Sequence, residues 1–163
     1  MVMVTNPVDV MSRIFAENSS AAVLGVGSNL DSARYRTLVA EHLAVPITAV
    51  AGSVLGEHGE PAVICAHATR VHHQPVQLPL GHIRAQLDQR SPRITAGVDR
   101  TQHGPAGAML STVAKLLGLV NGHEELSVAS DGGVYVGQRL RFVAGRYWND
   151  PPGHSPAERV ALT

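Results

Sequence analysis

The sequence predicts an α+β domain in which helices pack on mainly antiparallel strands. Segments with a helical spacing of apolar residues alternate along the chain with short apolar runs that are typical of buried strands. Near the C-terminal end, Asp131-Gly132-Gly133 separates two such runs, as in a tight β-hairpin. The length of 163 residues fits one domain of ordinary size, so we expect a single domain over residues 1–163.

The helical pattern is clearest near the N-terminus. Val10, Met11, Ile14 and Phe15 are spaced as on one helix face, and Pro7 suits a first turn. Later segments repeat this spacing, and Pro46 and Asn121-Gly122 end two of them. Helices are therefore expected over residues 8–17, 30–43, 105–119 and 155–162, with a short one near 80–87.

The strand-like runs are short and uncharged. They are bounded by glycine, proline, asparagine or serine, which favour turns. Strands are expected at residues 1–5, 21–26, 47–55 and 62–66, and in a hairpin of residues 126–130 and 134–143. The segment 67–104 is polar, contains several histidines and gives the weakest pattern.

The composition excludes several classes of protein. Hydrophobic residues make up 44% of the chain and charged residues 16%, with 13 basic and 13 acidic side chains, which gives no electrostatic footprint for nucleic acid or an anionic membrane. No apolar run approaches the roughly 20 residues of a membrane span, and the first ten residues lack a basic signal-peptide start. Cys65 is the single cysteine, so no disulfide can form within the chain and a cytoplasmic protein is expected. From the charge balance and the short apolar runs, we expect no membrane and no nucleic-acid partner.

The stretch GVGSNL, residues 25–30, resembles the start of a dinucleotide-binding loop. That fingerprint needs a third small residue, and Leu30 stands at its position. An acidic residue for the ribose should follow about twenty residues later, and residues 45–51 contain none. We therefore interpret Gly25 and Gly27 as turn residues rather than as a phosphate cradle.

Asp31 and Arg34 lie three residues apart, so a helix projects both from one face. A surface ion pair of small energetic consequence is the usual interpretation of such a pair. The alternative is a site in which the arginine grips a carboxylate and the aspartate stabilises an imidazolium. His58, between Gly56 and Gly59, is a candidate for that imidazole, although most histidines are simply exposed or satisfied in a core.

Three motifs taken in order resemble one family. TNPVDVM (5–11), GVGSNLDSARYRTLVAEHL (25–43) and LGEHGEPAV (55–63) are similar to the lactate/malate dehydrogenases, which are NAD-dependent 2-hydroxyacid dehydrogenases. The resemblance is close over residues 1–64, blurred over 67–104, and weaker afterwards. It starts at the end of the family's fifth Rossmann-type strand, so it implies the C-terminal, substrate-binding domain.

The resemblance implies a role for each of four residues. His58 corresponds to the family's proton donor and acceptor, and Asp31 to the partner that orients it. Arg34 corresponds to the clamp on the substrate carboxylate, which is that of a small 2-hydroxy or 2-oxo acid. Asn6 corresponds to the asparagine that binds the substrate oxygen beside the nicotinamide.

The resemblance also implies what to expect of the cofactor. The family's glycine-rich loop, its ribose-binding acid and its mobile catalytic loop precede the asparagine motif, and no such sequence stands before Asn6. NAD is implied by the family, but its main binding domain is expected to be missing, so the chain alone is expected to be inactive. The alternative is a non-catalytic oligomerising or binding module, with a homo-oligomer or a cofactor-domain partner covering its apolar surface.

Two weaker signals complete the sequence-based expectations. Ala106 stands roughly where many lactate-specific members have threonine or serine, which weakly disfavours a strict lactate enzyme. A metal site at Cys65, His67, His72 and His73 matches no established zinc spacing, so we expect a solvated loop and no metal.

Overall fold

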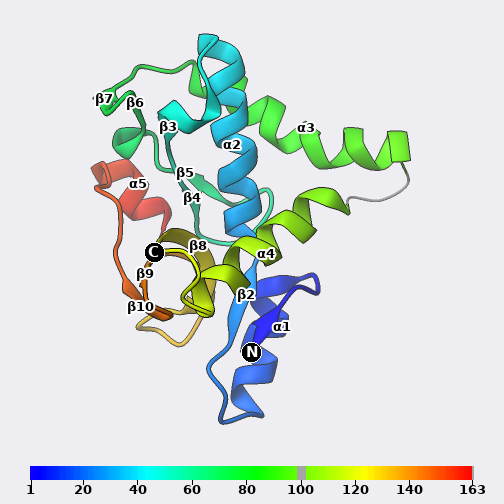
Figure 1. The fold of residues 1–163 in the computed structure, drawn as a ribbon. Helices are drawn as coiled ribbons and strands as arrows, with labels where there is room; N and C mark the ends of the chain where they lie inside the picture. Colours follow the sequence, from blue (N-terminus) through cyan, green and yellow to red (C-terminus); the bar gives the residue numbers. More distant parts are fainter. Residues whose placement is uncertain (99–101, 163) are drawn as a thin grey trace.

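The computed structural model describes residues 1–98 and 102–162 (Figure 1). Its largest sheet has the strand order β1-β2-β8-β9-β10. These strands are β1 (Val2–Met3), β2 (Leu24–Val26), β8 (Gly122–Ala129), β9 (Tyr135–Val143) and β10 (Arg146–Asn149). Strands β1 and β2 pair in parallel and the other neighbours are antiparallel, so the predicted α+β class is confirmed.

The described helices are α1 (Val8–Glu17), α2 (Ser28–Leu43), α3 (Leu80–Val98), α4 (His103–Leu116) and α5 (Pro156–Ala161). Figure 1 shows α2 in the middle of the molecule, with α3 and α4 on one side of it. The core follows α2, because Tyr35, Leu38 and Val39 are buried against Val54 and Ile83. Helix α2 therefore carries its first turn, with its polar side chains, into the interior.

The expected strand at residues 47–55 is wrong as one element. The chain instead forms a 3-10 turn, Ile47–Ala49, and two short strands, β3 (Val50–Ala51) and β4 (Val54–Leu55), which join different sheets. The break lies at Gly52, where a Cβ atom would come within 2.7 Å of the Tyr35 ring. Close packing on α2 therefore turns the chain, although the apolar run continues through the turn.

The two small sheets flank α2. Strand β3 pairs with β6 (Arg70–Val71), which pairs with β7 (Gln74–Pro75), and β4 pairs with β5 (Val63–Ile64). A second 3-10 turn, Ala66–Ala68, follows β5. Strands β4 and β5 thus enclose the loop that carries His58, which fixes both ends of that loop.

Helix α3 and strand β10 also differ from the sequence-based expectation. Helix α3 continues to Val98 through Pro92, well beyond the predicted residues 80–87. Strand β10 was missed, because a turn at Ala144-Gly145, both with positive φ, returns the chain after β9. The segment Arg146–Asn149 contains charged and polar residues, and its pairing with β9 is what makes it a strand.

The C-terminal elements agree with the prediction. The hairpin of β8 and β9 turns at Asp131-Gly132-Gly133, with Ser130 and Val134 closing the turn. Helix α5 begins with a capping box in which Ser155 and Glu158 exchange hydrogen bonds. Among residues 1–98 and 102–162, no helix is long and apolar enough to cross a membrane.

Candidate active site

The first turn of α2 and the loop after β4 meet at Gly27. A Cβ atom there would lie 2.8 Å from Cγ of His58 and 2.9 Å from Cγ1 of Val8, so only glycine leaves room for the imidazole ring. Asp31, one turn along α2, is 6% exposed and faces the same ring. The glycine is therefore needed for the close approach of the His58 and Val8 side chains, a reason that the interpretation as a turn residue did not include.

The His58 imidazole is held from two sides. Its Nδ1 lies 2.6 Å from Oδ2 of Asp31, and its backbone N–H donates to Oδ2 of Asp9 at 2.8 Å. Asp9 is buried in the first turn of α1, and sequence reasoning missed it, although the acid in NPVD was visible. This arrangement leaves Nε2 as the ring nitrogen that can exchange a proton with a ligand.

The same contacts control the charge of the imidazole. The hydrogen bond that the His58 ring donates to Asp31 raises the pKa of His58 above its ordinary value of 6.5, with the charges of Asp31 and Asp9 acting in the same direction. Burial and the positive charge of Arg34 oppose this rise in pKa. The site therefore favours the protonated ring, as a proton donor to a carbonyl oxygen requires.

Arg34 lies on the same helix face as Asp31. Its NH1 approaches Oδ1 of Asp31 at 3.6 Å, which is longer than a hydrogen bond, and its side chain is 12% exposed. Burial lowers the pKa of Arg34, and the charge of Arg90 also lowers it, whereas Asp31 raises it. The guanidinium thus remains able to bind an anion in two parallel hydrogen bonds.

These side chains line a cleft. The cavity has a volume of about 280 Å³ and is lined by Asp31, Arg34, His58, Gly59, Glu60, Leu87 and Asp88. The structure therefore brings three of the four predicted site residues together around one space. Leu87 and Asp88 come from α3, which the sequence predicted only as far as Leu87.

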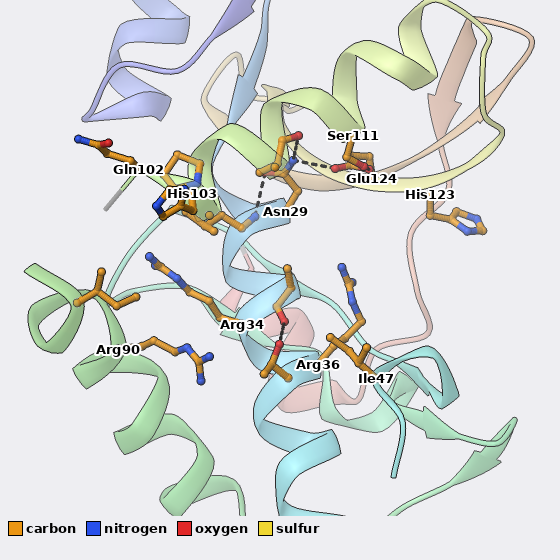
Figure 2. A pocket seen from close by; sticks show the side chains of 18 of the residues that line it. Asn29, Arg34, Arg36, Ile47, Arg90, Gln102, His103, Ser111, His123 and Glu124 are labelled. Atoms are coloured by element: carbon orange, nitrogen blue, oxygen red, sulfur yellow. Dashed lines mark hydrogen bonds between the residues drawn. The ribbon is translucent and has the colours of Figure 1, made fainter. Parts of the chain in front are cut away.

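A larger cavity of about 590 Å³ lies on the other side of Arg34, between α2, α3 and α4 (Figure 2). Its floor is a polar network around Glu124, which accepts hydrogen bonds from Asn29 at 2.8 Å and Ser111 at 2.9 Å and pairs with Lys115. Sequence analysis gave no signal for this network, because its members come from α2, α4 and β8.

Asn6 is exposed in the loop between β1 and α1, three residues before Asp9, and its peptide bond to Pro7 is cis. Its predicted role at the substrate oxygen stays a prediction. Ala106 is exposed on α4 and lines neither the cleft nor the larger cavity. The described cavities therefore give no support to the expectation that Ala106 stands near the substrate.

The turn at Gly25–Ser28 does not fit a dinucleotide pyrophosphate. A Cβ at Gly25 would lie 2.7 Å from both Ser12 Oγ and Ser127 Cβ, and Ser28 is 2% exposed. Side chains thus fill the space that phosphates would need. The interpretation of Gly25 and Gly27 as residues of a structural turn is consistent with this packing.

The four residues considered for a metal do not form one site. Cys65 is buried, and burial raises the pKa of its thiol to about 12, whereas His67, His72 and His73 are exposed. In the described ranges, no group of three or more His, Cys, Asp or Glu side chains is placed to hold a metal ion.

Comparison with solved structures defines the class of fold. A lactate dehydrogenase from a Medee basin deep-sea metagenome library superposes with a TM-score of 0.90 at 22% identity, over 99% of this chain and 58% of that chain. Malate dehydrogenase from Plasmodium falciparum in complex with NADH superposes with a TM-score of 0.89 at 20% identity, over 99% of this chain and 60% of that chain. The fold is therefore the one shared by lactate and malate dehydrogenases over this part of their chains.

Sequence relatives agree with the fold. Malate dehydrogenase of Sulfurisphaera tokodaii is 31% identical over 131 residues, 79% of this chain and 42% of that protein. Malate dehydrogenase of Sulfolobus acidocaldarius is 33% identical over 132 residues, which are 78% of this chain and 42% of that protein. No protein-family model matches the sequence. The chain belongs to the lactate/malate dehydrogenase family, and it spans about 42% of the length of these relatives.

Proposed function

We propose that this chain is the substrate-binding and proton-transferring half of a lactate/malate-type dehydrogenase. The observation that carries the proposal is the Asp31–His58 contact of 2.6 Å beside the guanidinium of Arg34. The neighbouring cleft supports it, because its volume of about 280 Å³ admits a small acid. NAD is the implied cofactor, because a solved malate dehydrogenase of similar fold is described in complex with NADH. Asp31, Arg34 and His58 are proposed to act on the substrate and not to bind NAD.

The residues divide the chemistry between them. Arg34 would hold the carboxylate of a 2-hydroxy or 2-oxo acid in two parallel hydrogen bonds, and thereby orient the oxygen at C2 toward His58. In oxidation, Nε2 of His58 would take the hydroxyl proton, and Asp31 would stabilise the imidazolium that forms. The implied NAD, when bound, would supply the acceptor for the hydride that leaves C2. In the reverse direction, the same nitrogen would return this proton to the carbonyl oxygen. Asn6 is proposed to bind the same oxygen from the cofactor side.

Binding of L-lactate tests the assignment without needing turnover. We expect the ¹H NMR signals of the His58 ring to shift as L-lactate is added, with a dissociation constant at least about tenfold weaker in Arg34→Gln, because a charge-assisted contact contributes about 1.5–3 kcal/mol. Arg13→Gln is the matched control, since Arg13 pairs with Glu17 on the exposed face of α1. Equal lactate binding by Arg34→Gln and the unchanged chain would refute the proposal.

A second function is favoured by the surface of α1. Val10, Ile14 and Phe15 are 52%, 46% and 41% exposed on one helix face, next to β1 at the edge of the main sheet. Such a face and edge favour packing on another copy of the chain or on a cofactor domain. Sedimentation is expected to show a dimer or a larger species, and a stable monomer would contradict this second role.

A further inference from the structure

The loop that carries His58 is held mainly at its two ends. At the start, Gly56 exchanges two main-chain hydrogen bonds with Gly137 on β9, and at the end the N–H of Ala62 donates to the oxygen of Gly59. Gly56 and Gly59 have positive φ angles of 84° and 112°, which glycine adopts at no steric cost. The place of the histidine between these two glycines therefore depends on contacts from outside the loop.

Asp9 supplies the contact to the main chain. In the described part of the chain, the N–H of His58 is the main-chain group between Gly56 and Gly59 that forms a hydrogen bond, and it donates to Oδ2 of Asp9 at 2.8 Å. Asp9 lies in the first turn of α1, where the helix dipole favours its negative charge. A hydrogen bond to an ionised acceptor is stronger than a neutral one. Helix α1 thus ties down the main chain of the histidine.

The same turn of α1 limits where the imidazole ring can lie. Val8 is 1% exposed within the core, which fixes this turn. Its Cγ1 atom and Cγ of the His58 ring both close on Gly27, at 2.9 and 2.8 Å from the position of an added Cβ. The ring therefore has little room to shift while it keeps its contact of 2.6 Å with Asp31.

The Asp9 side chain opposes folding more than a satisfied structural acid would. It is 9% exposed, and its Oδ1 has no hydrogen-bond partner among the described residues. Burial of a charged group with unused hydrogen-bonding capacity is unfavourable. Glu124, which is also buried, accepts hydrogen bonds at both oxygens. The hydrogen bond to His58 is thus what the buried carboxylate of Asp9 contributes to the molecule.

We propose that Asp9 is a positioning residue, which fixes the main chain of His58 so that the ring stays in contact with Asp31. The inference rests on the proposed function, because it takes His58 to exchange a proton with the substrate. Asp9 does not line the cleft beside His58, so it acts on a substrate only through the histidine. Its charge raises the pKa of His58, and its hydrogen bond adds to this by holding the ring against Asp31.

Two variants of the full chain separate charge from position. Asp9→Asn removes the charge and keeps an oxygen that accepts from the His58 N–H, whereas Asp9→Ala removes both. Glu17→Gln is the matched control, because it removes a negative charge from the exposed end of the same helix. The other charged groups that face His58 or line its cleft stay in place: Asp31 and Arg34 on α2, Asp88 on α3 and Glu60 in the loop.

NMR titration should give a lower pKa of His58 in both Asp9 variants, because both lose the charge that raises it. The pKa should fall further in Asp9→Ala, because the released loop also loosens the contact with Asp31. At about pH 5.5, where the ring is protonated, L-lactate should bind at least about threefold more weakly to Asp9→Ala and within about twofold of the unchanged chain to Asp9→Asn. Glu17→Gln should change neither quantity.

The outcomes distinguish this inference from the proposed function. Equal effects of both Asp9 variants on the pKa and on lactate binding would mean that Asp9 acts through charge alone, which overturns the inference. If Arg34→Gln weakens lactate binding while Asp9→Ala does not, the inference is overturned and the proposed function stands. If the unchanged chain binds no L-lactate, or Arg34→Gln changes nothing, the proposed function fails and the inference fails with it.

Hydrogen exchange of the His58 amide decides the question even if Asp9→Ala does not fold. In the unchanged chain and in Asp9→Asn, this amide should exchange at least about tenfold more slowly than the amide of the neighbouring exposed Glu57. Equal exchange of the two amides in the unchanged chain would overturn the inference.

Discussion

Helix α2 carries two buried polar centres, and they differ in how completely their acids are satisfied. Around Glu124, both carboxylate oxygens accept hydrogen bonds, from Asn29 on one side and from Ser111 and Lys115 on the other. Around Asp31, one oxygen bonds to His58 and the other lies 3.6 Å from Arg34, beyond hydrogen-bond distance. The side chains of Asp31 and Glu124 are almost equally buried, at 8% and 7% exposed.

Burial therefore does not distinguish the two centres, whereas unused hydrogen-bonding capacity does. The network at Glu124 joins α2, α4 and β8 and gives both oxygens of its acid a hydrogen-bond donor within the protein, which is typical of a structural role. The centre at Asp31 presents an imidazole nitrogen and a guanidinium to a cleft, which is typical of a binding site. The comparison predicts that substitutions in the two centres affect different properties of the protein.

The largest loss of stability is expected for Glu124→Ala. It leaves the ammonium of Lys115, 12% exposed, without its acidic partner, and breaking a buried pair costs about 3 kcal/mol or more. Urea denaturation at pH 7 measures the change in the free energy of unfolding. Glu17→Ala, which breaks the exposed pair with Arg13, is the control and should cost less than about 0.5 kcal/mol. Similar losses in both variants would contradict the structural role.

A smaller loss, combined with a loss of binding, is expected for Gly27→Ala. The added methyl group would meet the His58 ring and Val8, and such overpacking costs about 1–3 kcal/mol. Displacement of the ring should also weaken L-lactate binding, which a titration measures. The matched control is Gly81→Ala in α3, where no atom lies within 4 Å of the added Cβ, and no loss is expected. Unchanged lactate binding by Gly27→Ala would contradict the packing argument.

The smallest effect on stability, and the most specific one, is expected for Asp31→Asn. The folded-state pKa of His58 lies above 6.5, so its protonation stabilises the fold below that pH. This stabilisation is lost as the pH rises through the raised pKa. In Asp31→Asn, the NMR titration of His58 should give a lower pKa, and the accompanying pH dependence of the unfolding free energy should shrink. A His58 pKa that does not fall would show that Asp31 does not control its charge.

The sequence was sufficient for much of the local structure. The helical spacing of residues 8–17 and the turn residues Asp131-Gly132-Gly133 predicted elements that the structure confirms. The local apolar pattern gave a wrong prediction at residues 47–55, because contact of Gly52 with Tyr35 divides the apolar run into two strands. It also failed for β10, whose polar residues are strand because β9 lies beside them. In both cases, distant residues overrode the local pattern.

The same division holds for the candidate site. Asp31, Arg34 and His58 were predicted, because two of them share a helix face and the family motifs name all three. The contact between Asp31 and His58, which are 27 residues apart in the sequence, could be seen only in the folded structure. Asp9 lies within the motif of residues 5–11 but was given no role from sequence, and only the approach of α1 to the His58 loop shows that it accepts a hydrogen bond from that loop. Sequence alone thus determined which groups are present and which lie on one turn, whereas tertiary packing decided which charges meet and which remain free for a ligand.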